Sequence, residues 1–522
     1  MKNRIVKKAL SIALASAMVL GMVGCGGGQA AAPAAAPAAD AAAPADDTAA
    51  APADDTTAAP ADNGGVNISL YRCCFNTTPD SAKTAQVQDA INAYLAEKGA
   101  NVRITLTDIN SGEYTEKANL ALANNEINLL WTASWEGTIG TNDLVPQNSV
   151  YDITELLKGT DLYASMDEGQ WEATKYDGKN YFIPVYKDNV EGYDFMFRQD
   201  FLDAHTDLDA TTVKKLADLE PFLEAAKNDG LKYPFLTQKT AMFYRWYIND
   251  FDFFTADSTA NWVAVDRASN SVVDTILTPQ YKEFCTLMCQ WAEKGYISED
   301  DVTKVTTDTT TQTQDWAVSW WTDIPVNDEA DSRYEQDVTM VPATDRWAHS
   351  NSALGSCYCV TANSTEEQAK AAIEFMGLLY TDKKLADIYT FGIEGEDFNY
   401  DANGHVEQVE NAVYNHSMWE SASATVVTPL SNEPDNKAEL YKTFNGGANT
   451  SSAAGFRFDK APVEAAYAAC QNVFETYGFA LENGGYPSAD VEKVIEEYQA
   501  ALDEAGYQDV LAEFQKQYDA WK

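Results

Sequence analysis

The sequence holds 522 residues, of which 80 are Asp or Glu and only 36 are Lys or Arg, so its formal net charge at pH 7 is −44. A chain of this length can form two lobes with separate hydrophobic cores. Its charge repels phosphate backbones and anionic surfaces, which excludes nucleic acid as a partner and favours a neutral or cationic ligand.

The N-terminus has the layout of an export signal. Basic residues precede an apolar run over 9–23 that is short for a membrane span. The run ends in "MVGC", which resembles the lipobox of bacterial lipoproteins. The resemblance implies a signal peptide over 1–24 and a diacylglycerol on the thiol of Cys25. In an ordinary secretory signal, which is the alternative, Cys25 would be incidental.

Residues 25–65 contain almost only Ala, Pro, Asp, Thr and Gly. This composition buries too little apolar surface to offset the ordering entropy, and repeated proline interrupts any alanine helix. The segment is therefore predicted to be a disordered linker. Together with a lipid on Cys25, it would tether the folded body to the extracellular face of the bacterial cell membrane.

Strands and helices alternate at the start of the folded body. The stretches "VNISLY" (66–71), "NVRITLTDI" (101–109) and "INLLWTASW" (127–135) are typical of strands. Between them, residues 81–100 place large apolar side chains on one helical face, and an alanine-rich helix is expected from about 114 to 124. This order predicts a parallel sheet in an α/β fold.

Later segments are predicted from the same periodicities. A proline interrupts a strand expected within 178–189, and "WAVSW" (316–320) alternates as a strand on which Trp316 is the best candidate for the core. Two helices, over 488–505 and 508–521, each carry an apolar stripe that predicts core contacts.

The cysteines do not form a disulfide framework in the sequence. Seven of the eight follow Cys25, an odd number, and no C-x-x-C spacing occurs among them. Close neighbours such as Cys73 and Cys74 bridge poorly, so mostly buried thiols are expected.

The order of these elements and four particular stretches resemble the extracellular solute-binding lipoproteins of ABC importers. The resemblance is greatest to the carbohydrate-type proteins of family 1, the LipO-like group with its C-terminal region. Asn128 and Phe391 depart from the Asp and Tyr that this family often has. The stretches are "INLLWTASW" (127–135), "QWAEKGYI" (290–297), "FGIEGEDFNYD" (391–401) and "GFRFDKAPV" (455–463).

The resemblance implies a two-lobed α/β fold of the periplasmic-binding-protein type, with crossover hinge strands and a helical C-terminal region. The expected lobes are 66–186 with 348–390, and 187–347 with 391–522. The implied function is capture of a carbohydrate, expected to be an oligosaccharide, between the lobes and its delivery to the permease subunits of an ABC transporter. A monomer without a cofactor, a metal or an enzymatic activity is expected.

Candidate ligand contacts follow from what a sugar offers, namely C–H faces that stack on aromatic rings and hydroxyls that pair with polar groups. Residues at strand ends and near the expected crossovers are favoured, because strand ends line the crevice of an α/β lobe. We expect Trp320 or Trp321 to be a stacking platform, with Asp323 beside it, while the segment 243–254 also fits a core helix. The candidates are Trp135, Glu136, Tyr186, Asp188, Arg245, Trp246, Trp320, Trp321, Asp323, Trp347 and Trp419.

Two other functions stay open at the level of sequence. A surface glycoside hydrolase needs only a pair of carboxylates, and 80 acidic residues make some pair inevitable. The acidic charge also permits a peptide or a cationic solute as the ligand. The sequence contains no H-E-x-x-H, no G-x-S-x-G and no glycine-rich phosphate loop, and its four histidines show no ligand spacing.

Overall fold

The computed structural model describes residues 64–254, 261–302, 313–326, 337–349 and 351–522. The predicted signal peptide, Cys25 and nearly all of the predicted linker lie outside these residues.

The first sheet contains β1 (Val66–Cys74), β2 (Val102–Asn110), β3 (Leu129–Thr132), β15 (Cys357–Val360) and β6 (Phe182–Pro184), in the order β2-β1-β3-β15-β6. β1 pairs in parallel with β2 and β3, whereas β15 runs antiparallel to β3 and β6. The parallel arrangement predicted for the first three strands is confirmed.

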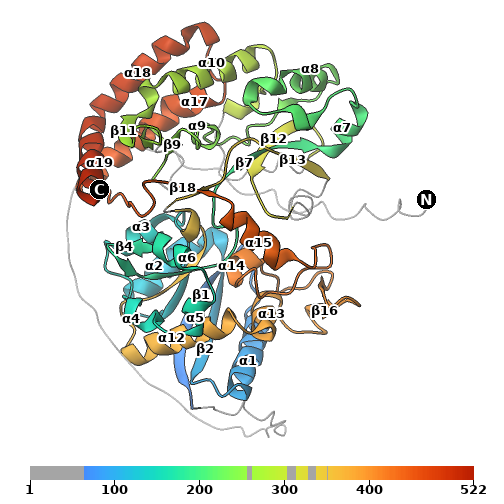
Figure 1. Ribbon diagram of the computed structural model, residues 1–522, viewed down its shortest axis with the longest axis vertical. Helices are drawn as coiled ribbons and strands as arrows, with labels where there is room; N and C mark the ends of the chain where they lie inside the picture. Colours follow the sequence, from blue (N-terminus) through green and yellow to red (C-terminus); the bar gives the residue numbers. More distant parts are fainter. Residues whose placement is uncertain (1–63, 255–260, 303–312, 327–336, 350) are drawn as a thin grey trace, which may run out of the picture. The chain divides into compact units, whose positions relative to one another are not determined.

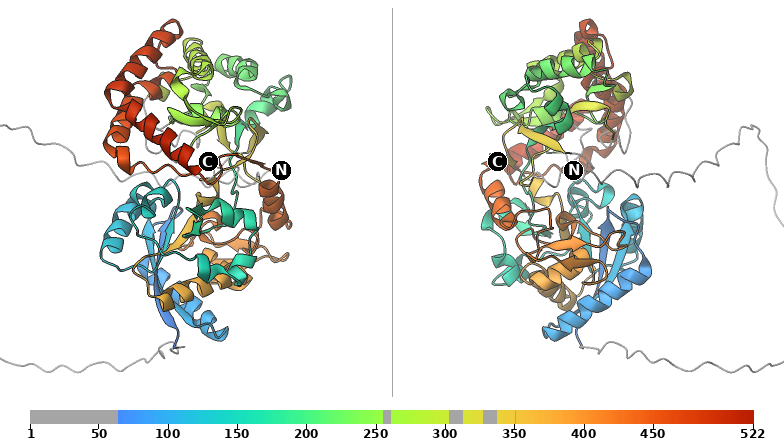
Figure 2. Two further views of the ribbon diagram at one scale, coloured as in Figure 1. Left: turned by 60° about the vertical axis from the view of Figure 1, so that its left-hand side comes forward. Right: turned by 90° about the vertical axis from the view of Figure 1, so that its right-hand side faces the viewer.

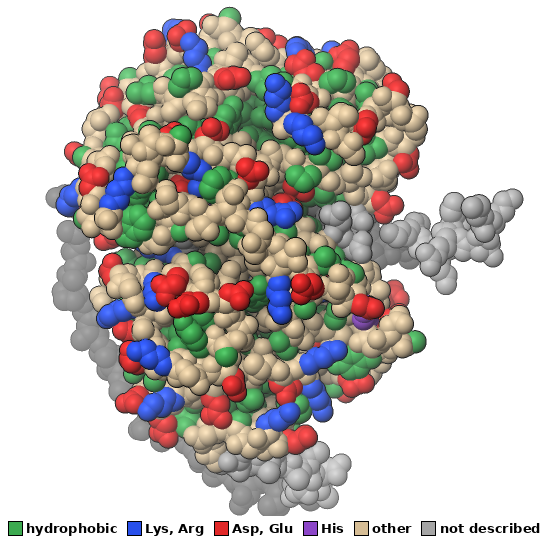
Figure 3. Space-filling model, viewed as in Figure 1, with side chains coloured by type: hydrophobic (Ala, Val, Ile, Leu, Met, Phe, Trp, Pro, Cys, Tyr) green, Lys and Arg blue, Asp and Glu red, His purple; other side chains and the backbone are tan. Residues whose placement is uncertain are grey.

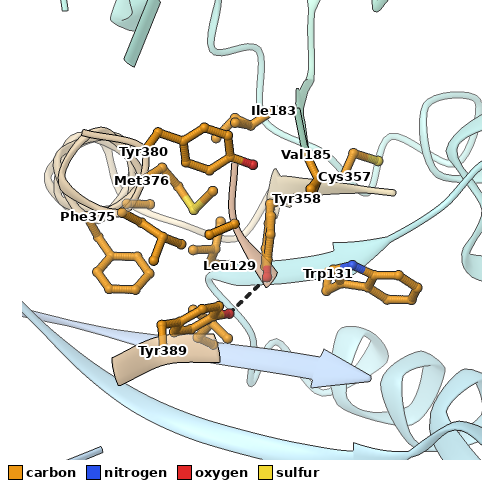
Figure 4. Packing of buried hydrophobic residues seen from close by; sticks show 14 of the residues in the cluster. Leu129, Trp131, Ile183, Val185, Cys357, Tyr358, Phe375, Met376, Tyr380 and Tyr389 are labelled. Carbon is orange, nitrogen blue, oxygen red and sulfur yellow. Dashed lines mark hydrogen bonds between the residues drawn. The ribbon is translucent and has the colours of Figure 1, made fainter. Parts of the chain in front are cut away.

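Helices pack around this sheet (Figure 1): α1 (Ser81–Glu97), α2 (Ser111–Ala123), α12 (Glu366–Leu379) and α13 (Lys383–Phe391). Asp80 caps α1 by accepting a hydrogen bond from the backbone N–H of Lys83 at 2.9 Å, and Gly99, with φ of +71°, follows its end. The apolar face predicted for this helix is buried. Inside the core, the hydroxyls of Tyr358 and Tyr389 are 3.0 Å apart (Figure 4).

A second sheet contains β13 (Val338–Pro342), β7 (Tyr193–Arg198), β12 (Trp316–Thr322) and β8 (Tyr233–Phe235), in the order β13-β7-β12-β8. A smaller sheet beside it consists of β11 (Ser271–Asp274), β10 (Val263–Asp266) and β9 (Phe251–Asp252). The helices of this part are α7 (Gln199–Ala204), α8 (Glu220–Asn228), α9 (Phe243–Trp246) and α10 (Pro279–Glu293). Trp316 is fully buried in β12, as predicted.

Four helices form the C-terminal region: α16 (Glu464–Val473), α17 (Phe479–Glu482), α18 (Val491–Glu504) and α19 (Tyr507–Trp521). α18 and α19 confirm the two helices predicted there. Figures 1 and 2 show both in red, and in Figure 1 α18 lies beside α10 and α19 near β11. Most of the predicted stripe is buried, but Trp521 is 41% exposed because it lies in the last turn of the chain.

Short elements complete the description of the chain. They are α3 (Thr141–Leu144), α4 (Thr154–Leu157), α5 (Asp161–Ala164), α6 (Glu168–Ala173), β4 (Lys175–Tyr176), β5 (Lys179–Asn180), β16 (Phe398–Tyr400), β17 (Val406–Gln408), α14 (Met418–Ser421) and α15 (Lys437–Gly446).

Two large hydrophobic cores define two lobes. The first core surrounds the first sheet and includes residues up to Tyr441, whereas the second surrounds the β7 sheet and includes the C-terminal helices. The sequence-based boundary that placed all of 391–522 in the second lobe is therefore corrected, because side chains from Phe391 to Tyr441 pack in the first core. β16, β17, α14 and α15 follow α13 directly and stay on its lobe (Figure 1).

Among the described residues, three crossover segments connect the lobes: 185–192, 343–356 apart from residue 350, and 447–452. The second contains β14 (Trp347–Ala348) and the third β18 (Asn449–Thr450), and these pair in parallel. Glu191 of the first segment forms an antiparallel bridge with Trp347. The three segments therefore lie side by side.

The cysteines agree with the expectation from the sequence. Each of the seven cysteines beyond Cys25 is a buried free thiol, as predicted. None of the described helices is both long and apolar enough for a membrane crossing. On the face shown in Figure 3, acidic and basic side chains are interspersed, with no continuous basic stripe of the kind that binds nucleic acid.

Candidate functional site

A cavity of about 340 Å³ lies where the first lobe, the crossover segments and the second lobe meet. Its volume is near the lower end of the ~300–1,000 Å³ that is typical of ligand pockets. The first lobe contributes Ser134 and Trp135. The crossover segments contribute Lys187, Asp188, Val190, Glu191, His349, Asn351, Ser352 and Gly355, and the second lobe contributes Tyr244, Ile248, Asp252, Phe253, Asn261, Arg267 and Thr322.

Trp135 is the large aromatic ring that the first lobe presents to this cavity. It follows the carboxyl end of β3, and its indole N–H donates a hydrogen bond of 2.7 Å to the carbonyl of Gly355. The residue is nevertheless 44% exposed, which is unusual for tryptophan. The hydrogen bond fixes the ring while leaving apolar surface available to a ligand.

The ionisable side chains among the described lining residues all have partners. Lys187 Nζ lies 3.1 Å from Asp188 Oδ1, and Arg267 Nη2 lies 2.6 Å from Asp252 Oδ1. Glu191 pairs with His349 and also accepts a hydrogen bond from the hydroxyl of Tyr193. Burial disfavours the charge of Glu191, but His349 outweighs it, so the pKa of this carboxyl is lowered. Because each of these groups already has a partner within the protein, the lining favours a neutral ligand.

Arg267 and Trp347 join the second lobe to the crossover segments. The guanidinium carbon of Arg267 lies 3.7 Å from the centre of the Trp347 ring, and the indole N–H of Trp347 donates to Asn249 Oδ1 at 3.0 Å. Burial is the main cause that lowers the pKa of Arg267. Trp347 thus lies at the predicted crossover. It packs against the guanidinium of Arg267 and does not line the cavity itself.

Neither of the two tryptophans expected as a platform lines the cavity. Trp320 is 5% exposed, donates from its ring N–H to the carbonyl of Thr237 at 3.1 Å, and is covered by Arg245 at 3.9 Å. Trp321 stacks on Trp320 with ring centres 6.2 Å apart. The residue of β12 that reaches the cavity is the next one, Thr322.

Of the predicted contacts, Trp135 and Asp188 line the cavity, and the others do not. Glu136 is turned inward, where it accepts a hydrogen bond from Thr115 Oγ1 at 2.7 Å and burial raises its pKa. Trp246 stacks on Phe195 with ring centres 5.0 Å apart.

Tyr186 and Asp323 also lie outside the lining. Tyr186 is 3% exposed and packs in the first core, and Asp323 is paired with Arg346. Arg245 is held between Tyr244 and Trp320 and donates to the carbonyl of Ala241. The residue of this segment that lines the cavity is its neighbour Tyr244.

Trp419 is brought next to Trp135, although it is not part of the lining. Their ring centres are 6.4 Å apart, and Phe75 lies 5.9 Å from Trp135 and 4.9 Å from Trp419. Sequence reasoning missed Phe75, although it follows β1 in the same way as Trp135 follows β3. The second-lobe residues Asn261 and Arg267 carry no comparable signal in the sequence.

One group of described residues has the spacing of metal ligands, but its charges are already satisfied. His416 Nε2 lies 3.5 Å from Cys74 Sγ and 3.8 Å from Asp108 Oδ2. Burial and Arg72 oppose protonation of His416, yet hydrogen bonds with Asp108, Cys74 and Glu420 raise its pKa well above the usual value. Arg72 also holds both oxygens of Asp108. A charged imidazole offers no lone pair, so the cluster fits a buried ion network better than a metal site.

The lobes also touch through the C-terminal region. Arg457 donates to the carbonyl of Ala173 and to Asn351 Oδ1, both at 2.9 Å, and its guanidinium carbon lies 4.6 Å from the ring centre of Tyr176. Lys460 Nζ lies 3.1 Å from Asp143 Oδ1. Ala173, Tyr176 and Asp143 belong to the first lobe, so residues of the C-terminal region bridge the two lobes.

Comparisons with known proteins agree with this architecture. A carbohydrate ABC transporter substrate-binding protein of Streptococcus pneumoniae serotype 4 is 25% identical over 443 residues, which cover 81% of this chain and 86% of that protein. The crystal structure of the N-glycan transport solute binding protein NgtS from S. pneumoniae has a TM-score of 0.74 at 22% identity, over 87% of this chain and 98% of that one. An extracellular solute-binding protein from Bifidobacterium longum subsp. infantis has a TM-score of 0.59 at 14% identity, over 88% and 98% of the two chains.

Two family models match the chain. Residues 452–522 match a domain of unknown function, DUF3502, and residues 89–394 match the bacterial extracellular solute-binding protein model, which thereby covers more than half of the sequence. The predicted family and the predicted two-lobed α/β class are confirmed. The chain belongs to the family of bacterial extracellular solute-binding proteins, which bind substrates rather than convert them.

Proposed function

We propose that the protein is a receptor that binds a neutral oligosaccharide between its two lobes and delivers it to the permease of an ABC transporter. The observation that carries the proposal is the cavity between the lobes, in which an exposed Trp135 faces a lining whose acidic and basic side chains are paired with one another. A flat apolar face suits the C–H surface of a pyranose, and a lining without unpaired charge suits a ligand that carries hydroxyls only.

The relatives support a carbohydrate as the ligand. The pneumococcal relative is a carbohydrate ABC transporter substrate-binding protein, and NgtS has been crystallised with Man1GlcNAc and with Man5GlcNAc. A cationic solute is disfavoured, because Asp188, Glu191 and Asp252 already have partners and would have to exchange them for the ligand.

We also propose that the mature protein begins at Cys25 and is anchored there by lipid to the extracellular face of the membrane. The basic start, the apolar run and the "MVGC" ending support this. A linker over 25–65 would let a monomer reach the permease while remaining tethered. Replacing Cys25 with Ala should move the protein from the membrane fraction to the medium, and retention of the variant in the membrane would contradict the anchor.

Calorimetric titration with a panel of neutral glycans tests the ligand. Trp135→Ala should weaken binding by about 2 kcal/mol, or roughly thirty-fold in Kd, as expected for an anchor tryptophan. Trp521→Ala is a matched control, because Trp521 has a similar exposure of 41% but packs on Phe456 and Tyr518 away from the cavity. Equal effects of the two substitutions would contradict the proposal, and release of shorter sugars from the glycan would point to a hydrolase.

A further inference from the structure

A cluster of aromatic rings on the first lobe adjoins the cavity. Trp135 lies in the cavity lining, and Phe75 and Trp419 lie beside it but outside the lining. We propose that Phe75 and Trp419, here called the outer platform, bind further sugar units of the same ligand. The proposal rests on the carbohydrate function proposed above, and it specifies that the substrate is a chain that extends beyond the cavity.

The topology brings these rings to one edge of the first sheet. Phe75 directly follows the last residue of β1, and Trp135 follows β3 by a few residues. β1 and β3 are paired in parallel, so their carboxyl ends lie at the same edge. Trp419 arrives from α14, whose carbonyls at Glu420 and Ser421 accept hydrogen bonds from the hydroxyl of Tyr358.

A buried tryptophan forms the floor beneath the platform. Trp131 of β3 is fully buried, and its ring N–H donates to Ser356 Oγ at 2.9 Å (its place in the core is shown in Figure 4). Its ring centre lies 5.5 Å from that of Phe75, 5.9 Å from that of Trp135 and 6.3 Å from that of Trp419. Trp135 and the two rings of the outer platform therefore share one support.

The segments that carry the platform are also held from behind. His416 and Glu420 flank Trp419 in sequence and are buried in the network with Asp108 and Cys74. Closer to the surface, Asn76 Nδ2 donates to Ser417 Oγ at 2.9 Å, which ties the residue after Phe75 to the start of α14. Rigid aromatic faces lose little entropy on binding, which is the property that a stacking surface requires.

The solvent-exposed surface of the outer platform, and its contact with Trp135, indicate which kind of ligand covers it. Phe75 and Trp419 are packed on the first core but are only partly buried, so apolar ring surface remains in contact with solvent. Their contact with Trp135 makes this surface continuous with the cavity, and adjacent ring centres are separated by 4.9 to 6.4 Å. The planes of these rings are inclined to one another by 47° to 64°, so the surface is faceted. Further units of a sugar chain that leaves the cavity past Trp135 would meet this apolar surface.

The test compares short and long glycans. The full folded body is titrated in a calorimeter with linear glucans and mannans of one to six units, and with Man1GlcNAc and Man5GlcNAc, using the wild type, Phe75→Leu, Trp419→Leu and the control Trp521→Ala. Leucine keeps apolar volume over Trp131 but removes the flat face, and thermal melting checks that each variant is folded. In the wild type, affinity should rise with chain length within the series that binds.

The expected result concerns the ratio of long-chain to short-chain affinity. Each platform substitution should reduce this ratio by about three- to ten-fold, as expected for the loss of one aromatic stacking contact, whereas Trp521→Ala should leave it unchanged. An unchanged ratio in both platform variants, or a wild type whose affinity does not depend on length, would overturn the proposal. If no glycan binds to the wild type at all, the proposed function itself fails, and binding of apolar peptides with loss in the platform variants would identify a different occupant.

Discussion

Asp194 gives the sharpest prediction about how pH affects this fold. It lies on β7 at the end of the first crossover, is 4% exposed, and its Oδ1 has no hydrogen-bond partner. Burial, followed by repulsion from Asp323, raises the pKa of this carboxyl to about 8. At neutral pH the folded protein therefore keeps Asp194 protonated.

The direction and size of the change in stability with pH follow from proton linkage. Between about pH 4 and about pH 8 the folded state holds a proton that the unfolded state, with an Asp pKa of ~3.9, has released. Stability therefore falls as pH rises through this window, by up to ~1.4 kcal/mol per pH unit from this one group. The loss amounts to about 4 kcal/mol between pH 5 and pH 8, and it levels off above pH 8 because both states are then ionised.

Asp194→Asn removes the ionisation while keeping the size of the side chain. Urea unfolding followed by tryptophan fluorescence at pH 5, 6, 7, 8 and 9 should show that the variant gains on the wild type steadily up to about pH 8 and by a constant amount above it. Asp345→Asn, which removes an exposed carboxylate in a neighbouring crossover, is the control and should run parallel to the wild type. If the unfolding free energies of the wild type and of Asp194→Asn differ by the same amount at every pH, the reasoning is refuted.

Three further substitutions test a contact between the lobes, a buried hydrogen-bond acceptor and the packing of a buried ring in β12. Arg457→Met removes a hydrogen bond and a ring contact between the lobes, and a second hydrogen bond to Asn351 of the second crossover segment, so it should weaken the contact between the lobes by about 1–2 kcal/mol and increase the radius of gyration of the ligand-free protein in X-ray scattering. Glu482→Ala leaves the N–H groups of Met242 and Phe243 and the amide of Asn261 without their acceptor, and it should lower the free energy of unfolding by about 3 kcal/mol in urea titrations. Trp316→Ala empties a fully buried site in β12, and it should cost about 3–5 kcal/mol by the same measurement.

Each of these has a conservative counterpart. Scattering identical to the wild type for Arg457→Met would show that the bridge does not hold the lobes, and Arg457→Lys should have a smaller effect than Arg457→Met. Glu482→Gln retains an acceptor for the backbone N–H groups, so a loss as large as that of Glu482→Ala would contradict the assigned role. Trp316→Phe should recover part of the stability, and an alanine variant as stable as the wild type would mean that the ring is not part of the core.

Periodicity in the sequence was enough to predict the first three strands and the two C-terminal helices. β1 to β3 and α18 to α19 carry local patterns whose apolar faces meet within a short stretch of chain, so each pattern alone defines its element. The position of Trp135 followed from the same reasoning, because parallel strands of an α/β lobe end at the ligand crevice.

Long-range packing was beyond the reach of such patterns. Whether residues 391–441 join the first or the second core depends on where the third crossover lies, and nothing in the local sequence marks β18 as that crossover. The same limit applies to Trp320. Its ring is covered by Arg245, which comes from a segment 75 residues earlier in the chain, and is hydrogen-bonded to Thr237.

The side chains of the second lobe show a further limit. Arg267 reaches the cavity from just beyond β10 and is paired there with Asp252 of β9. Both residues look like ordinary surface charges in the sequence, and only the pairing of two short strands places them in the site. Charged residues of this kind have no periodic signature, since their role depends on the register between strands.

The central claim, a neutral glycan held between the lobes by Trp135 and a lining without unpaired charge, is tested most directly by titration at two salt concentrations. Neutral glycans should bind the wild type with an affinity that does not change between low and high salt, since no net charge is exchanged, and Trp135→Ala should weaken that binding. Absence of binding by every neutral glycan, together with salt-dependent binding of a cationic peptide or amine, would contradict the account.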